Sequence, residues 1–288
     1  MEISSIALSR SVNGTNATLC TFTLEQTSPR DSYILRGITG LDVDDLTPQL
    51  HSTGRVTNKR FVQVKPKARE ITMRVILNPN PNPPSGIPET ASELRNKLYT
   101  LISSYRTSQI RLGFLEQAYE QVFIEGFITK FESNLDSQIS EVTITVRCDY
   151  PYFRSPERFS VPNLSTLNKL RPVFTNGFSN APHGFRLRLI ATEPFNYFIM
   201  GSPNAYDWVF DISGFTFQTG DTLSISSEED NKYVVMERGA LITDLIRYVG
   251  SYSEWPLLFP GVNSDLEIGG GLPFNYVEFS YYGTLWGL

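Results

Sequence analysis

Apolar and polar side chains alternate with a period of two in several stretches of this sequence, in both halves of the chain. The clearest stretches are residues 69–78, 141–149, 184–190 and 275–283. Successive side chains of a β-strand point to opposite faces of a sheet, so this pattern predicts strands with one face on a core and the other in solvent. We therefore expect a mainly β protein.

One segment departs from this pattern, because its apolar residues recur at the three- and four-residue spacing of a helix face. In the stretch just before it, the Thr90 hydroxyl can accept a hydrogen bond from a free backbone N–H while Glu93 bonds back to the cap. The spacing predicts one α-helix at residues 90–106. Its apolar stripe consists of Leu94, Leu98, Leu101, Ile102 and Tyr105.

Proline and glycine positions divide the chain further. Residues 78–88 are rich in proline, which cannot donate to a sheet, and we expect a projecting loop there. Between residues 150 and 182 the alternation weakens, which predicts a linker. Gly220 lies between two short β-like stretches, 215–217 and 223–225, and this signal predicts a β-hairpin. The expected organisation is a β-rich domain with the helix at residues 1–153 and an all-β domain at residues 154–288.

The composition adds limits on function. Apolar residues make up 40% of the chain and charged residues 19%, which is enough to bury a core. The formal net charge of −5 argues against general nucleic-acid binding, which depends on a basic surface. Two cysteines far apart in sequence form no disulfide framework, so folding in a reducing cytoplasm is expected. We expect neither an export signal nor a membrane span.

One stretch of about twenty residues is strongly basic, with Glu70 as its single acid. Three interpretations stay open: a solvated strand and loop face, a contact with an acidic neighbouring subunit, or a contact with passing DNA. The candidate contact residues are Arg55, Lys59, Arg60, Lys65, Lys67 and Arg69, with Arg74 just beyond them.

The residues that could carry catalysis or bind metal are few. His51 and His183 lie in turn-like stretches without a metal-ligand pattern, and we interpret them as surface or satisfied histidines. No phosphate-binding loop, nucleophile elbow or dinucleotide motif is present. We therefore expect no enzymatic activity, no cofactor and no metal. The acidic clusters are interpreted as a polar turn and a solvated loop tip, formed by Asp42, Asp44 and Asp45 and by Glu228, Glu229 and Asp230.

The order of several motifs resembles the siphophage distal tail protein family. At residues 137–155 a strand runs into an Asp-x-Pro-Tyr-Phe element, here Asp149, Pro151, Tyr152 and Phe153. Upstream, the stretches at 33–42, 69–79 and 123–133 follow, with the helix, in the order which that family shows.

The second half of the chain agrees with the same family. Gly220 and Asp221 resemble its glycine-aspartate hairpin, and residues 253–263 resemble its Ser-x-Trp…Pro-Gly-x-Asn loop. The matching positions in that loop are Trp255, Pro260, Gly261 and Asn263. The match spans nearly the whole chain, and the order and co-occurrence of the motifs carry it.

This resemblance implies a fold and a function. The first domain is expected to be a tail-tube-like β-barrel or sandwich that forms a hexameric ring, and the second a peripheral galectin-like β-sandwich. The implied protein is a structural virion component of the phage tail tip, assembled in the cytoplasm of the host bacterium. Its implied partners are copies of itself, the tail tube protein and tail hub or adhesion proteins, with viral DNA passing through without sequence-specific binding.

Two other functions stay open at this point. Aromatic residues of the second half favour, as the main alternative, a carbohydrate-binding β-sandwich that mediates host recognition. An enzyme that degrades cell-wall polymer is the third class, and it needs carboxylates placed together in one cleft. For the ring, a DNA channel favours weakly charged or negative walls, so the basic stretch 55–74 is expected to face protein and not the channel.

Overall fold

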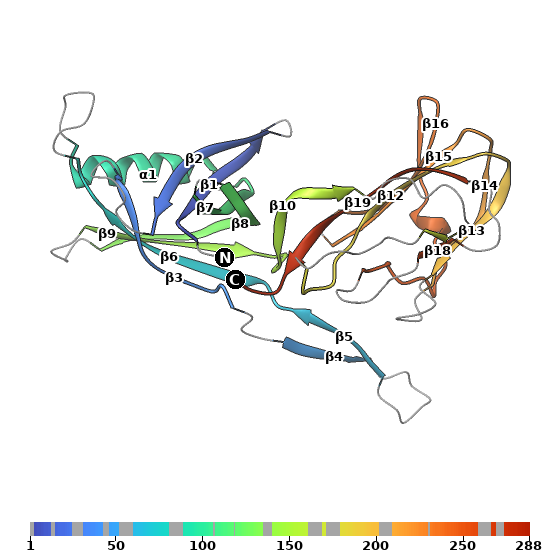
Figure 1. Cartoon of the computed structure of the whole chain (residues 1–288), viewed down its shortest axis with the longest axis horizontal. Helices are drawn as coiled ribbons and strands as arrows, with labels where there is room; N and C mark the ends of the chain where they lie inside the picture. Colours follow the sequence, from blue (N-terminus) through green and yellow to red (C-terminus); the bar gives the residue numbers. More distant parts are fainter. Residues whose placement is uncertain are drawn as a thin grey trace. The chain divides into compact units, whose positions relative to one another are not determined.

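In the computed structural model the chain folds as two compact units (Figure 1). The first unit comprises Met1–Pro156 together with Trp286–Leu288, and the second comprises Glu157–Leu285. Strands dominate both units, so the mainly β fold expected from the alternation is confirmed. The structure describes residues 3–12, 15–24, 31–42, 46–51, 60–80, 89–105, 107–117, 119–134, 140–160, 169–170, 179–201, 209–229, 231–258, 266–268 and 274–288.

The first unit is built around a barrel of seven strands. Neighbouring strands follow the order β8-β7-β1-β2-β3-β6-β9, and β9 pairs again with β8, which closes the barrel. Closure leaves the barrel strands with neighbours on both sides, which removes open edges. The strands are β1 (Ser5–Val12), β2 (Thr15–Thr23), β3 (Tyr33–Thr39), β6 (Arg69–Leu77), β7 (Ile110–Glu116), β8 (Tyr119–Asn134) and β9 (Glu141–Cys148).

The alternation predicted for residues 69–78 is present in β6. Ile71, Met73 and Val75 are fully buried, whereas Glu70 and Arg74 between them are exposed. On the neighbouring strand β9, the apolar positions opposite these residues are buried in the same way. The two strands therefore present one shared face to the barrel core.

Strand β8 closes the barrel because it serves two partners. Its first part pairs with β7 and its second part with β9, and Gly126 lies where the partner changes. A Cβ at Gly126 would lie 2.4 Å from the Arg147 carbonyl oxygen, so any side chain here would prevent the close approach of β8 and β9. Glycine is required at this position because a side chain has no room, and not because the backbone adopts a positive φ.

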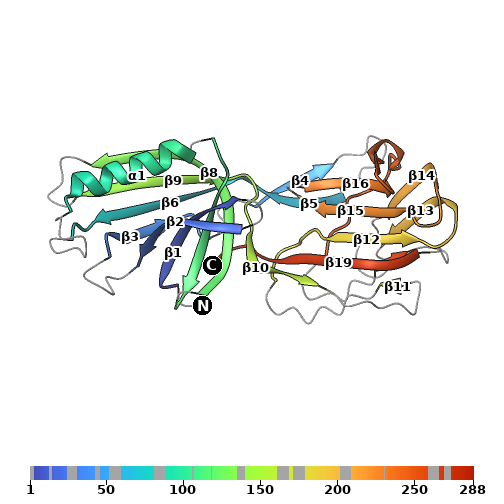
Figure 2. The ribbon, with the colours of Figure 1, turned by 90° about the horizontal axis from the view of Figure 1, so that it is seen from above.

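The predicted helix is α1 (Ala91–Tyr105), and its start matches the capping signal. The Thr90 backbone N–H donates to a Glu93 carboxylate oxygen at 2.8 Å, and the Glu93 N–H donates to the Thr90 hydroxyl at 3.2 Å. The helix buries Leu94, Leu98 and Ile102. In Figures 1 and 2 it lies beside β6 and β9 of the barrel.

Two strands of the first half form a separate two-stranded sheet. They are β4 (Leu46–His51) and β5 (Arg60–Pro66), which pair in antiparallel fashion. The predicted proline-rich loop lies almost entirely outside the described residues. Its two ends are held together, because the Glu89 N–H donates to the Asn80 carbonyl oxygen at 3.1 Å.

The second unit is a β-sandwich of two sheets. One has the order β17-β16-β15-β12-β19 and continues to β10 (Phe153–Ser160), and the other has the order β11-β18-β13-β14. Figure 2 shows β16, β15, β12 and β19 side by side. The strands are β11 (Lys169–Leu170), β12 (Arg186–Ala191), β13 (Phe195–Gly201), β14 (Val209–Phe217), β15 (Thr222–Glu228), β16 (Asn231–Arg238), β17 (Leu241–Asp244), β18 (Leu266–Ile268) and β19 (Phe274–Leu285), with a short 3₁₀ turn, η1 (Ile246–Tyr248).

The core of the sandwich is largely aromatic. Phe185 and Phe279 come from one side and lie 5.0 Å apart, while Phe195 and Phe217 stack at 4.5 Å between their ring centroids on the other. Both sheets contribute residues to this single buried cluster. Phe274 of β19 lies 4.6 Å from Phe195 of β13, measured between ring centroids, so this pair crosses from one sheet to the other. Aromatic pairs add specific geometry to the area they bury, and a pair that crosses fixes how the two sheets face each other.

The predicted hairpin around Gly220 is wrong in its pairing. Gly220 has the positive φ of 87° that the turn signal implied. However, β14 pairs with β13 in one sheet, while β15 pairs with β12 and β16 in the other. The turn therefore carries the chain from one sheet to the other. The hairpin that does form joins β15 to β16.

The predicted linker at residues 150–182 is also wrong over its first part. Strand β10 (Phe153–Ser160) begins there, and Phe153 and Ser155 are buried in it. Prolines at both sides hid this strand, because proline removes a sheet donor and weakens the alternation on which the prediction rested.

Candidate functional site

The Asp-x-Pro-Tyr-Phe element lies between β9 and β10 and anchors the start of β10 to the barrel. The Phe153 side chain has no exposed surface and packs edge-on against Phe114 of β7, with 5.4 Å between ring centroids. The guanidinium of Arg69 lies over the same Phe153 ring, 4.7 Å from its centre. Pro151 is buried beside it. Pro151 and Phe153 therefore stabilise the first unit by packing in its interior.

The remaining positions of the element form a row of aromatic contacts. Tyr152 lies between Tyr150, at 5.1 Å, and Trp286, at 4.9 Å, measured between ring centroids. Asp149 stays exposed and pairs with Arg147 at 3.1 Å. An exposed pair of this kind contributes little stability, so the aromatic row is what holds the element in place.

Arg69, a predicted contact residue, is used inside its own unit. Only 9% of its surface is exposed. Its guanidinium donates to the carbonyl oxygens of Gly40 at 3.1 Å and Leu41 at 2.5 Å, and to that of Trp286. The side chain is therefore not on an outer contact surface of this unit.

Of the other five predicted contact residues, only Lys67 has a side chain that the structure describes. Lys67 is exposed, next to the end of β5. Arg60 and Lys65 belong to β5, and their side chains are outside the described part. Arg55 and Lys59 lie outside the described residues altogether. Contact with a neighbouring subunit stays a prediction for these five residues.

Gly220 and Asp221 build the corner between the two sheets of the sandwich. The Asp221 side chain is 1% exposed and accepts a hydrogen bond from the Gln218 N–H at 2.7 Å. Arg238 donates to both carboxylate oxygens, at 2.8 and 2.6 Å. The Arg238 hydrogen bonds are the main reason why the pKa of Asp221 is lowered. The motif aspartate is thus a structural charge that pins the turn.

The third motif is described only in part. Trp255 packs against Phe210 of β14 with 5.5 Å between ring centroids, at the edge of the sandwich core. Pro260, Gly261 and Asn263 lie outside the described residues. The role of this loop beyond the Trp255 contact stays a prediction.

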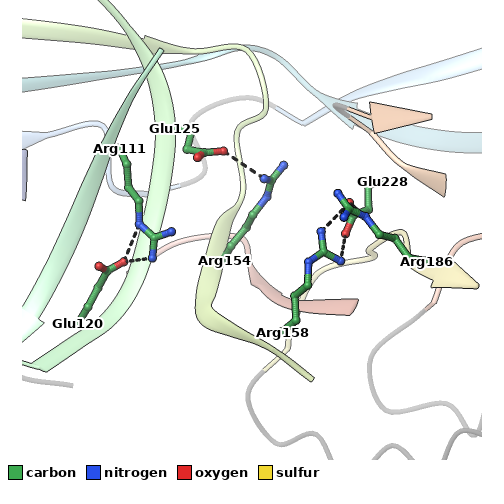
Figure 3. A network of polar contacts seen from close by, with 7 residues as sticks. All are labelled: Arg111, Glu120, Glu125, Arg154, Arg158, Arg186 and Glu228. Carbon is green, nitrogen blue, oxygen red and sulfur yellow. Dashed lines mark hydrogen bonds and ion pairs between the residues drawn. The ribbon is translucent and has the colours of Figure 1, made fainter. Parts of the chain in front are cut away.

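The interpretation of Glu228 as part of a solvated loop tip is wrong. It ends β15, only 8% of it is exposed, and two arginines hold it. Arg158 approaches to 2.6 Å and Arg186 to 2.9 Å, and Figure 3 shows the carboxylate between them. The Arg158 guanidinium also lies 4.2 Å from the centre of the Tyr282 ring. The neighbouring Glu229 is the exposed residue of the pair and contacts Lys232.

Two further arginine-carboxylate pairs lie in the first unit, and sequence reasoning missed both. Arg111 of β7 contacts Glu120 at 2.5 Å, and Arg154 of β10 contacts Glu125 of β8 at 3.3 Å (Figure 3). Both arginine side chains are only 10% exposed. Because their partners come from neighbouring strands, the pairs fix β7, β8 and β10 to one another.

Among the histidine and cysteine side chains that the structure describes, those of His183 and Cys148 are buried and that of Cys20 is half-buried. His183 is 2% exposed and stacks on Tyr281 at 5.1 Å, and burial lowers its pKa to about 4, so the ring is neutral at pH 7. Burial raises the pKa of the Cys20 and Cys148 thiols to about 12. Asp42 is exposed, while Asp44, Asp45 and Asp230 lie outside the described residues, as does the side chain of His51.

In the part of the chain that the structure describes, no three His, Cys, Asp or Glu side chains gather in the way that a metal ion requires. None of the helices described is both long enough and apolar enough to cross a membrane.

The two units together define a class of fold: a closed β-barrel that carries one helix, with a β-sandwich as the second unit. The Dit protein of phage SPP1 (gp 19.1), a paradigm of the hub adsorption apparatus in phages that infect Gram-positive bacteria, has a similar structure. The alignment covers 97% of this chain and 99% of that chain, with a TM-score of 0.58 and 15% sequence identity. The fold implied by the family resemblance is therefore confirmed.

Structures of the phage p2 baseplate in its activated conformation, one with Sr and one with Ca, also align with this chain. Each alignment covers 99% of both chains, with 8% identity and a TM-score of 0.47. No family model matches the sequence, and no curated protein does.

Proposed function

We propose that this chain is a distal tail protein of a long-tailed phage, a structural component of the virion tail tip. Six copies form a ring that joins the tail tube to the host-adhesion apparatus and lets viral DNA pass. The protein acts through shape and contact, without catalysis. The observation that carries the proposal is the likeness of fold to a phage hub protein over almost the full length of both chains.

The construction of the first unit supports a role as a ring subunit. A ring closes only if each copy meets the next at the same angle, so small distortions within a subunit would add up around the ring. The barrel, closed by β8 and β9, and the ion pairs of Arg111 and Arg154 hold this unit in one shape. A rigid subunit of this kind favours a closed ring over open chains.

The basic stretch supplies a candidate contact between copies. We place Lys67, with Arg55, Lys59, Arg60 and Lys65, at a surface that meets acidic groups of the neighbouring copy. A position on the channel wall would retain passing phosphates, which works against DNA passage. Arg69 is not part of this contact, because its guanidinium is occupied inside the unit.

Native mass spectrometry of the purified full chain tests the ring directly. The chain has a mass of 32.6 kDa, so the expected particle has a mass of about 196 kDa. A stable single copy at micromolar concentration would contradict the proposal. It would turn attention to the carbohydrate-binding alternative, which a glycan array with the same protein then examines.

Charge reversal tests the contact surface. Lys67→Glu is expected to shift the six-copy particle toward smaller species, and more so at low salt, where like charges repel more strongly. The control is Arg247→Glu, an equal charge reversal at an exposed residue of the second unit. If both variants keep the same mass as the unaltered chain, the basic stretch is not at the contact between copies.

A further inference from the structure

The segment that follows β19 returns to the first unit. Strand β19 (Phe274–Leu285) belongs to the second unit, whereas Trp286–Leu288 belong to the first. The first unit is therefore made from two pieces of chain, with the whole second unit encoded between them.

Arg69 is the residue that gathers these pieces. Its guanidinium donates to the carbonyl oxygens of Gly40 and Leu41, just after β3, and to that of Trp286. The Leu288 N–H donates to the Leu41 carbonyl oxygen at 3.3 Å. Several hydrogen bonds therefore tie the returning segment to the end of β3.

Aromatic packing supports the same arrangement from the other side. The Trp286 ring lies 4.9 Å from Tyr152, and the Arg69 guanidinium lies over Phe153. Tyr152 and Phe153 are the aromatic residues of the element that starts β10. The returning segment thus contacts the end of β3, the start of β6 and the start of β10 at once.

Arginine is suited to this position for a physical reason. Its planar guanidinium carries five N–H donors in a fixed fork, so one side chain can satisfy carbonyl groups from separate segments. Arg69 is 9% exposed, so carbonyl groups deprived of it would lose a donor in a place that water reaches poorly. Lysine carries a single nitrogen and cannot span the same set of acceptors.

We propose that Arg69 and Trp286–Leu288 form a latch that completes the first unit only after the second unit has been synthesised. Arg69 and Trp286 are 217 positions apart, and a contact across so long a separation is slow to form. The first unit stays loose at the β3 end and at the start of β10 until the latch closes. This inference rests on the proposed ring: because of the latch, only the full chain is competent to assemble into it.

Hydrogen exchange measured by mass spectrometry on the full chain and its variants tests the latch. The variants are a chain ending at Leu285, Trp286→Ala and Arg69→Lys. In each, peptides that cover Gly40–Leu41 and residues 148–155 are expected to exchange at least about tenfold faster, because local opening becomes easier. Peptides of β12 and β15 in the second unit are expected to keep their protection.

Arg74→Lys is the matched control, since Arg74 lies on the same strand as Arg69 but is exposed. It is expected to leave exchange unchanged everywhere. Unchanged protection at Gly40–Leu41 in all three latch variants would overturn the proposal. So would an equal loss of protection in both units, because the latch predicts an effect confined to the first.

Native mass measurements on the same proteins separate this proposal from the ring itself. Latch variants are expected to form less of the six-copy particle while the second unit stays protected. A single-copy unaltered chain would overturn the ring and leave the exchange result to decide the latch. Full assembly of the chain ending at Leu285, with unchanged exchange, would overturn the latch and leave the ring intact.

Discussion

Arg69, Arg158 and Arg186 each hold a group that lies far away in the sequence. Arg69 bonds a carbonyl 217 positions away, and Glu228 is 70 positions from Arg158 and 42 from Arg186. A run of charges in the sequence indicates a solvated surface only when no distant strand packs over it. For this reason Glu228 and Arg69 were placed at the surface by sequence reasoning, although the fold buries both.

The Glu228 site gives a prediction at this scale. Glu228→Gln leaves two arginines facing each other without their carboxylate, and we expect a loss of about 2 kcal/mol in the free energy of unfolding of the second unit. Urea unfolding followed by tryptophan fluorescence measures the change. Glu229→Gln is the control, because this exposed neighbour should change stability by less than about 0.5 kcal/mol. Equal effects at both positions would contradict the buried site.

His183 gives a pH dependence. A histidine in the unfolded chain has a pKa near 6.5, and burial lowers the pKa of His183 in the folded protein to about 4. The unfolded chain binds more protons between these values, so the stability that is complete above pH 6.5 is lost as the pH falls toward 4.

His183→Asn removes this titration. Between pH 7 and pH 4.5 the unaltered protein is expected to lose about 2 kcal/mol more stability than the variant, measured by urea unfolding at each pH. Carboxylates titrate in both proteins and cancel in the difference. Parallel stability curves for the two proteins would show that His183 does not stay neutral in the fold.

At the scale of elements, the sequence predicted best where the signal is local. The helix was predicted because its cap and its apolar stripe both lie within sixteen residues, from Thr90 to Tyr105. The alternating strands β6 and β9 were predicted for the same reason. The turn at Gly220 was recognised, but a turn signal states only that the chain changes direction and not which sheet the next strand enters.

The helix cap can be tested separately from packing. Thr90→Ala removes the hydroxyl that accepts from the Glu93 N–H, and we expect the first unit to lose about 1 kcal/mol of stability. Thr100→Ala is the control, because this exposed hydroxyl bonds only within the helix, to the Asn96 carbonyl oxygen. Alanine favours a helix interior, so the control is expected to be neutral or slightly stabilising. Thermal unfolding followed by circular dichroism distinguishes the two.

At the scale of the whole molecule, the fold followed from the order of motifs along the chain and not from any one of them. The Asp-x-Pro-Tyr-Phe element and the glycine-aspartate turn both prove to be packing features, in which Phe153 and Asp221 are buried. Such residues identify a fold because the fold needs them in place. They carry no direct information about partners, which we propose to depend on surfaces such as the one around Lys67.

We propose that the barrel unit forms a six-copy ring with the sandwich unit outside it. Single-particle electron microscopy of the purified full chain tests this most directly. The expected particle has sixfold symmetry, an open central channel lined by the first unit, and the second unit at the rim. Particles without rotational symmetry, or a ring with the second unit around the channel, would contradict it.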